Sequence, residues 1–153
     1  MSRGCGMCNA CCTVFEIDEL NKPSHSRCVH LVARPCTKSC SIYKDRPEPC
    51  RTYECPWKQG FGSSNHRPDK IGMLLQIAET NGQTVYVVYK LREEWSPKAL
   101  ALITRYSLRY PVVRAKKDGH ALLGGPESAI RKMFAGAPQG AVDSLLSKAE
   151  GDA

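Results

Sequence analysis

The sequence predicts an α+β protein in which an irregular cysteine-rich lobe, residues 1–66, precedes a small ββαββα lobe, residues 67–153. All nine cysteines fall between Cys5 and Cys55, in a stretch without sustained helical or strand periodicity. Beyond a loop-like run at 58–68, apolar segments alternate with turn dipeptides and helix-start residues. Because 153 residues is the size of one compact domain, we expect the two lobes to pack together.

The first strand–strand–helix unit is predicted from two β-favouring segments, 71–80 and 84–91. Asn81-Gly82 lies between them and suits a tight type I′ turn, so the segments should form a hairpin. Ser96-Pro97 then supplies an N-cap and a first-turn proline, and apolar residues follow at helical spacing as far as Arg109.

The second unit repeats this order over shorter segments. Strands at 112–116 and 120–123 should turn at Asp118-Gly119, and Pro126 should open a helix that Gly136 ends. Four apolar residues near the C-terminus share one helical face, which predicts a short terminal helix that either docks on the sheet or frays: Val142, Leu145, Leu146 and Ala149.

The chemistry of the first lobe is predicted from the spacing Cys5-x-x-Cys8-x-x-Cys11-Cys12. Two-residue gaps let consecutive thiolates converge on one metal ion as the backbone wraps around it. Adjacent side chains point apart in a strand and in a helix, so Cys11 and Cys12 should serve two centres or bridge one polynuclear cluster. The other cysteines could complete two four-cysteine sites and leave one thiol over, in a partition that spacing does not settle: Cys28, Cys36, Cys40, Cys50 and Cys55.

These cysteines are expected to be reduced, in a cytoplasmic protein. Residues 1–10 hold no apolar stretch of the length that an export signal needs, and no apolar run approaches the ~20 residues of a membrane-spanning helix. The odd number of cysteines also speaks against a disulfide framework, and reducing compartments favour metal sites.

The formal net charge of +7 raises nucleic-acid binding as an alternative function. Ligand cysteines bind metals as thiolates, so much of this positive charge would be offset within the metal sites. A basic patch indicates nucleic acid only when it lies on one face, which a sequence does not reveal. We therefore expect a protein partner and no membrane, with nucleic acid as the alternative.

The cysteine pattern resembles a family of zinc- or iron-chelating domains whose hallmark is a Cys-x-x-Cys-x-x-Cys-Cys motif near the N-terminus. Cys28 with Leu31 resembles the second block of that family, the run from Cys40 to Cys55 resembles its long third block, and Arg67-Pro68-Asp69-Lys70 resembles a recurring stretch. The resemblance covers about the first 75 residues. It implies eight metal ligands: Cys5, Cys8, Cys11, Cys12, Cys28, Cys40, Cys50 and Cys55.

Cys36 departs from the family pattern and is the candidate for the leftover thiol, although it could instead replace Cys40. His25 or His30, on either side of Cys28, could complete a site of three cysteines and one histidine. Tyr53, Trp57 and Phe61 are expected to form the apolar cover of a metal site, the alternative being a stacking surface for bases.

Four-thiolate sites hold both zinc and iron–sulfur clusters. We expect zinc, because structural zinc sites of this type are commoner and would order a lobe with few apolar residues. Iron or an iron–sulfur cluster is the alternative, because a Cys-x-x-Cys-x-x-Cys run with a remote Cys55-Pro56 is similar to bacterial ferredoxins. A similar motif also occurs in a larger flagellin lysine methyltransferase thought to carry such a cluster.

No nucleotide-binding glycine loop, nucleophile–histidine pair or paired acid site is found, so no catalytic residue is predicted. The expected function is metal chelation with a structural or partner-binding role. An iron–sulfur redox or protein-modifying enzyme component and a nucleic-acid-binding zinc module are the alternatives.

Overall fold

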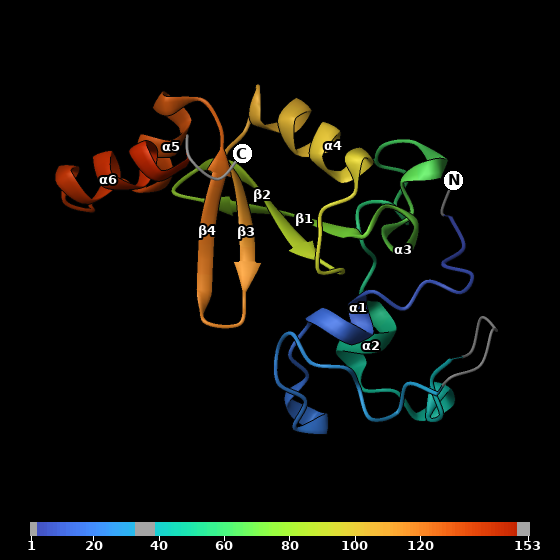
Figure 1. Ribbon diagram of the computed structural model, residues 1–153. Coiled ribbons are helices and arrows are strands. Elements are labelled where there is room, and N and C mark those ends of the chain that lie inside the picture. Colours follow the sequence, from blue (N-terminus) through green and yellow to red (C-terminus); the bar gives the residue numbers. More distant parts are fainter. Residues whose placement is uncertain (1–2, 33–38, 150–153) are drawn as a thin grey trace.

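The computed structural model describes residues 3–32 and 39–149 of the chain. Its cysteine-rich part consists of short helical turns joined by irregular loops, together with two isolated β-bridges, Ile17 with Lys22 and Leu31 with Cys40. Figure 1 shows α1 (Cys11–Val14), α2 (Glu48–Thr52) and the 3-10 helices η1 (Asp18–Leu20) and η2 (Tyr43–Asp45) in one lobe below the β-sheet. The 3-10 helix η3 (Ser64–His66) lies apart from them, next to α3.

The second part of the chain forms a four-stranded mixed sheet with four helices. The strands are β1 (Met73–Thr80), β2 (Gln83–Lys90), β3 (Val112–Lys116) and β4 (Gly119–Gly124), in the order β1-β2-β3-β4. Both hairpins are antiparallel, whereas β2 and β3 pair in parallel because a helix crosses between them. The helices are α3 (Pro68–Ile71), α4 (Pro97–Ser107), α5 (Glu127–Met133) and α6 (Gln139–Ala149). The α+β class is confirmed, and α6 packs against β4.

The two hairpin turns explain how the strands begin and end. Asn81 and Gly82 have φ angles of 52° and 67°, as a type I′ turn requires, and the Asn81 side chain donates a hydrogen bond to the Met133 carbonyl at 2.9 Å. In the second hairpin Gly119 pairs with Lys116, so the turn residues are 117 and 118. The expectation of a turn at Asp118-Gly119 was thus wrong by one residue, because Gly119 already belongs to the ladder of β4.

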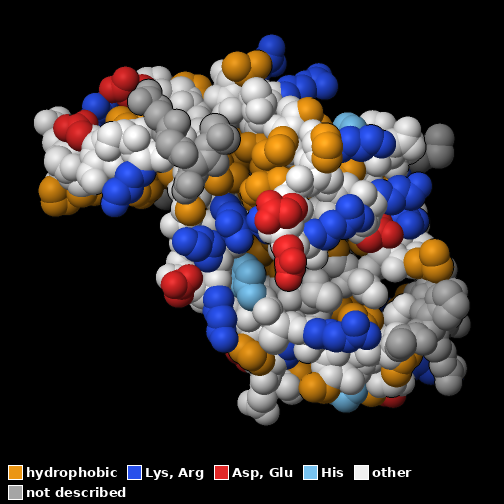
Figure 2. Space-filling view, in the orientation of Figure 1, with side chains coloured by type: hydrophobic (Ala, Val, Ile, Leu, Met, Phe, Trp, Pro, Cys, Tyr) orange, Lys and Arg blue, Asp and Glu red, His pale blue; other side chains and the backbone are white. Residues whose placement is uncertain are grey.

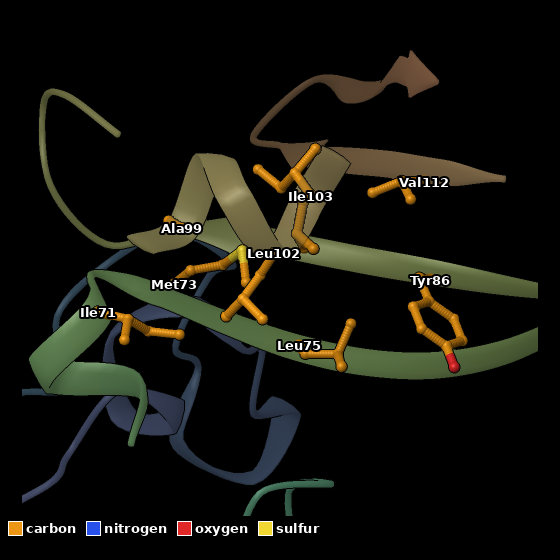
Figure 3. Close-up of a cluster of buried hydrophobic side chains, with 9 residues drawn as sticks. Ile71, Met73, Leu75, Tyr86, Ala99, Leu102, Ile103 and Val112 are labelled. Carbon is orange, nitrogen blue, oxygen red and sulfur yellow. The ribbon is translucent and has the colours of Figure 1, made fainter. Parts of the chain in front are cut away.

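The main core lies between α4 and one face of the sheet. Ser96 caps α4 by accepting a hydrogen bond from the Ala99 N–H at 3.1 Å, and its hydroxyl donates to the Ile71 carbonyl at 2.6 Å. This cap fixes the start of the helix over the start of β1. Figure 3 shows the helix residues Ala99, Leu102 and Ile103 directed at the strands. They bury Ile71, Met73, Leu75, Tyr86, Val88 and Val112.

The opposite face of the sheet is shared by α5 and the cysteine-rich lobe. Because successive strand residues point to opposite faces, Val85 and Val113 face away from α4 and pack with Met133 of α5. Leu74 also faces away from α4 and packs with Ala10 and Val14 of the cysteine-rich lobe. That lobe therefore rests directly on the sheet.

Two further contacts tie the cysteine-rich lobe to the strands. The rings of Phe15 and Tyr89 meet edge to face at 5.2 Å, and His25 Nε2 lies 3.1 Å from the Ala115 carbonyl oxygen of β3. Apolar packing and a long-range hydrogen bond thus fix the position of the lobe. Among the residues that the structure describes, no helix is both long enough and apolar enough to cross a membrane.

Candidate metal centre

The first cysteine motif folds into a tight turn that leads into α1. The Cys8 N–H donates to the Cys5 carbonyl at 3.0 Å, and Gly6 within this turn has a φ of 58°. A Cβ atom at Gly6 would lie 2.9 Å from an Arg67 guanidinium nitrogen. Glycine is therefore required here both by the backbone angle and by the close approach of Arg67.

One set of four thiols gathers around this turn. Burial raises the pKa of Cys5, and the nearby Cys55 thiolate raises it further. Burial likewise raises the pKa of Cys8 to about 11, with an added effect of Cys5. After larger effects of Cys12 and of burial, the thiolates of Cys8 and Cys5 raise the pKa of Cys11. After the effect of burial, the thiolates of Cys55 and Cys11 raise the pKa of Tyr53. We call these four residues the first set: Cys5, Cys8, Cys11 and Cys55.

A second set of four thiols lies around Cys50. Burial raises the pKa of Cys50, and the thiolates of Cys12, Cys28 and Cys40 raise it further. The backbone also brings these residues together, because the Cys28 N–H donates to the Cys12 carbonyl at 3.0 Å and Cys40 forms a β-bridge with Leu31. We call them the second set: Cys12, Cys28, Cys40 and Cys50.

The two sets meet at the neighbouring residues Cys11 and Cys12. A hydrogen bond between the two thiols raises the pKa of Cys11 and lowers that of Cys12 to about 7. The positive charges of Lys22 and Arg46 also favour the Cys12 thiolate. The two thiols are therefore direct neighbours, and the expectation that they serve different metal ions stays a prediction.

These sets are defined by proximity, and their members do not form coordination shells. In residues 3–32 and 39–149, no group of three or more His, Cys, Asp or Glu side chains has the geometry of a metal site. Charges act on one another over longer distances than a metal–sulfur bond spans, which is why the thiols influence each other without converging. All eight thiols are free of disulfides, and Cys36 lies outside the described residues.

A buried lysine lies beside the second set. Lys22 is 6% exposed, and its ammonium donates to the carbonyl oxygens of Phe15 and, at 3.3 Å, of Pro23. Burial lowers the pKa of Lys22, whereas the thiolates of Cys28 and Cys12 act in the opposite direction. An ammonium group has three N–H donors, so one is left beyond these two carbonyls. Lys22 therefore supplies positive charge where the second set would carry negative charge.

An arginine–aspartate pair supports the first set. Arg67 binds the Asp69 carboxylate through two nitrogens, at 2.6 and 2.9 Å. Burial opposes ionisation of Asp69, but the hydrogen bonds from Arg67 and one with the Cys8 thiol lower the pKa of the carboxyl. Arg67 thus contacts the turn at Gly6 while Asp69 contacts Cys8. These contacts give a physical reason for the Arg67-Pro68-Asp69 sequence.

Tyr53 carries an unsatisfied hydroxyl next to the first set. Its ring packs edge to face on Phe15 at 4.7 Å, and its hydroxyl is buried with no hydrogen-bond partner among the described residues. Burial raises the pKa of this phenol, and the charges of Cys55 and Cys11 raise it further. A neutral O–H donor is therefore held close to two thiols of the first set.

The other residues singled out by the sequence take different positions. His25 contacts Ala115 of β3, and His30 shares a 3.4 Å hydrogen bond with Ser41. Arg46 stacks on Tyr43 with 3.7 Å between the guanidinium carbon and the ring centroid. Of the expected aromatic cover, Tyr53 lies near Cys55 and Cys11, and Trp57 and Phe61 line a small pocket together with Cys55. Phe61 also packs with Tyr86 and Tyr106 on the α4 face of the sheet, and the Trp57 indole donates to the Ser63 carbonyl.

The sequence analysis did not predict the contacts that Lys22, Arg67 and the Tyr53 hydroxyl make near the cysteines. No sequence period marks these contacts, and only the resemblance pointed to the stretch that contains Arg67. Basic side chains are spread over the face of the molecule in Figure 2, among acidic and apolar ones, and form no single patch there.

Comparisons with models of known families, with curated proteins and with solved structures gave no match.

Proposed function

We propose that this protein binds metal ions through two four-cysteine sites, the first set and the second set. The observation that supports the proposal is the mutual electrostatic influence of the eight described thiols, of which Cys5, Cys8 and Cys55 lie on the side of Cys11, and Cys28, Cys40 and Cys50 on the side of Cys12. Zinc is the expected metal, and iron or an iron–sulfur cluster is the alternative. The role that follows is structural, with the ordered lobe available to a protein partner.

The donor chemistry of both sets fits this proposal. Thiolates are soft ligands that favour zinc and iron–sulfur clusters, and four of them fill a tetrahedral site. A zinc ion with four thiolates carries a net negative charge, so nearby cations stabilise it. Lys58 and Arg67 act on Cys5 of the first set, and Lys22 and Arg46 act on Cys12 of the second set.

Metal binding would also connect segments that are distant in the sequence. The first set joins the N-terminal turn to Cys55, and the second set joins α1 to Cys28, Cys40 and Cys50. Such cross-links order a loop-rich region because the ligands come together only in the folded state. The bound metal would thereby supply folding free energy to the lobe.

Metal analysis of natively purified protein tests this proposal. We expect one zinc ion per set, with Cys11→Ser and Cys12→Ser each losing one ion and the double variant losing both. Cys36→Ser is the matched control and should keep the full metal content. Replacement of zinc by cobalt should give the absorption of a four-sulfur site, reduced by half in each single variant. Visible absorption and bound iron in protein purified without oxygen would identify iron instead.

Two results would contradict the proposal. If the natively purified chain holds no stoichiometric metal and all its thiols react freely with an alkylating reagent, it is not a metal-binding protein. If Cys11→Ser alone releases all the metal, the thiols form one polynuclear centre and the division into two sites is wrong.

A further inference from the structure

We propose that a cavity on the α4 face of the sheet is a binding site for a nucleoside phosphate. The cavity has a volume of about 660 Å³ and lies between the loop at 61–66, β2 and the C-terminal half of α4. Pockets of about 300–1,000 Å³ are typical of small-molecule sites. No cysteine of either set lines this cavity, and Cys55 of the first set lines a smaller neighbouring pocket that shares Phe61 and Tyr106 with it.

The walls of the cavity are aromatic. Tyr86 and Tyr110 stack with ring centroids 4.6 Å apart, and Tyr106 meets Tyr86 edge to face at 5.1 Å. Phe61 approaches both Tyr86 and Tyr106 at 6.0 Å. Tyr86 is buried, so the rings available to a ligand are the partly buried ones of Phe61, Tyr106 and Tyr110. Aromatic rings bind the bases of nucleotides by stacking, at about 1–3 kcal/mol per base.

Two arginines provide the charge for an anionic group. Arg105 and Arg109 line the cavity one helical turn apart, and both are exposed. Neither forms an ion pair or a side-chain hydrogen bond with another described residue, and no acidic side chain lines the cavity in the described part of the chain. Guanidinium groups bind phosphate oxygens in a bidentate manner. The cavity therefore combines a surface for a base with two unused phosphate donors.

The loop that forms one wall is held in place before any ligand binds. The Arg3 guanidinium donates to five carbonyls between Trp57 and Ser63, at distances of 2.7–3.4 Å. The Ser63 N–H donates to His66 Nδ1 at 3.3 Å, which fixes the imidazole against the cavity. A preformed wall lowers the ordering cost of binding.

The proposed ligand is a base joined to a phosphate. It is supplied either by a free nucleotide or by a single strand of nucleic acid. We expect adenosine monophosphate to bind saturably in a calorimetric or NMR titration of the full chain. Adenosine and inorganic phosphate should each bind at least about tenfold more weakly, because each keeps only half of the contacts. A short single-stranded oligoadenylate distinguishes the sources: tighter binding than the mononucleotide indicates a strand, and equal binding indicates a free nucleotide.

Variants of α4 make the test specific. Arg105→Ala with Arg109→Ala should weaken nucleotide binding by about tenfold or more, because both phosphate donors are lost. Lys98→Ala removes a positive charge from the exposed start of the same helix, outside the cavity lining, and should leave binding unchanged. Both arginines are exposed, so the double variant should unfold at the same temperature as the parent protein.

Three outcomes would overturn the proposal. The first is the absence of saturable binding of adenosine monophosphate. The second is binding of inorganic phosphate as tight as that of the nucleotide, which would show that the aromatic walls contribute nothing. The third is equal weakening by Lys98→Ala and by the double arginine variant, which would indicate a general effect of positive charge.

Discussion

Replacement of the buried hydroxyl of Tyr53 should weaken metal binding by the first set alone. This hydroxyl has no hydrogen-bond partner among residues 3–32 and 39–149, and it lies near Cys55 and Cys11. If a metal holds those cysteines as thiolates, their sulfur atoms become strong acceptors for the O–H group. Tyr53→Phe keeps the ring that packs on Phe15 and removes only this donor.

The expected magnitude follows from the change in hydrogen bonding. A hydrogen bond to a charged group contributes about 1.5–3 kcal/mol, and no described residue competes with the thiolates for this hydroxyl. The whole free energy of this hydrogen bond therefore contributes to the metal affinity of the first set, and its loss should lower that affinity by about tenfold or more. The second set has no described contact with this hydroxyl and should keep its affinity.

Competition with a chromophoric zinc chelator measures the two affinities. Tyr43→Phe is the matched control, because Tyr43 is 40% exposed and its ring lies under Arg46, so loss of its hydroxyl should change neither affinity. An unchanged first-set affinity in Tyr53→Phe would refute the inferred hydrogen bond. An equal loss in both sets would show that the substitution disturbs the whole lobe.

Three further predictions test the centre and the sheet separately. Lys22→Met removes the buried charge beside the second set, so that set alone should bind metal more weakly in the same chelator competition; an unchanged affinity would mean that the charge plays no part. Alkylation of the metal-free protein, followed by mass spectrometry, should show that Cys12 becomes reactive as the pH rises through about 7 and Cys8 only toward about 11. The reason is that only the thiolate is nucleophilic. Equal pH profiles of the two cysteines would contradict this order. Gly125→Ala should lower the free energy of unfolding by about 1–3 kcal/mol in urea denaturation, because φ is 142° and the new Cβ would lie 2.6 Å from the Pro111 Cα; unchanged stability would mean that the loop relaxes freely.

Most elements of the sheet lobe were predictable because local chemistry sets them. The helix α3 was not predicted, and Ile71, expected to open the first strand, ends this helix instead. Asn81-Gly82 takes the positive φ angles that its turn requires, and Ser96 caps the helix that it was expected to cap. The parallel pairing of β2 with β3 has no such local signal. It depends on α4 crossing the sheet and burying Leu102 and Ile103, which is a tertiary effect.

The arrangement of the candidate centre could not be predicted from the sequence, and its ligands stay a prediction. The thiols near Cys12 come from the irregular segments around Cys28 and Cys40 and from Cys50 in α2, whose relative positions no sequence period encodes. The partition rests instead on single backbone contacts, such as the Cys28 N–H donating to the Cys12 carbonyl. The residues around the cysteines were harder to predict than the cysteines themselves, because a sequence does not distinguish a buried lysine such as Lys22 from a surface lysine.

The distribution of the core shows why the cysteines matter for folding. Within the described residues, the cysteine-rich lobe contributes only five buried apolar side chains, Ala10, Val14, Cys28, Leu31 and Pro56, and the sheet and its helices contribute the others. Apolar burial therefore anchors α1 on the sheet but leaves the loops between α1 and α2 with little to hold them. Conformational entropy opposes order in those loops, and hydrogen bonds alone give a small net gain. Metal binding as proposed above would supply additional free energy to these loops, because its ligands come together only in the folded chain.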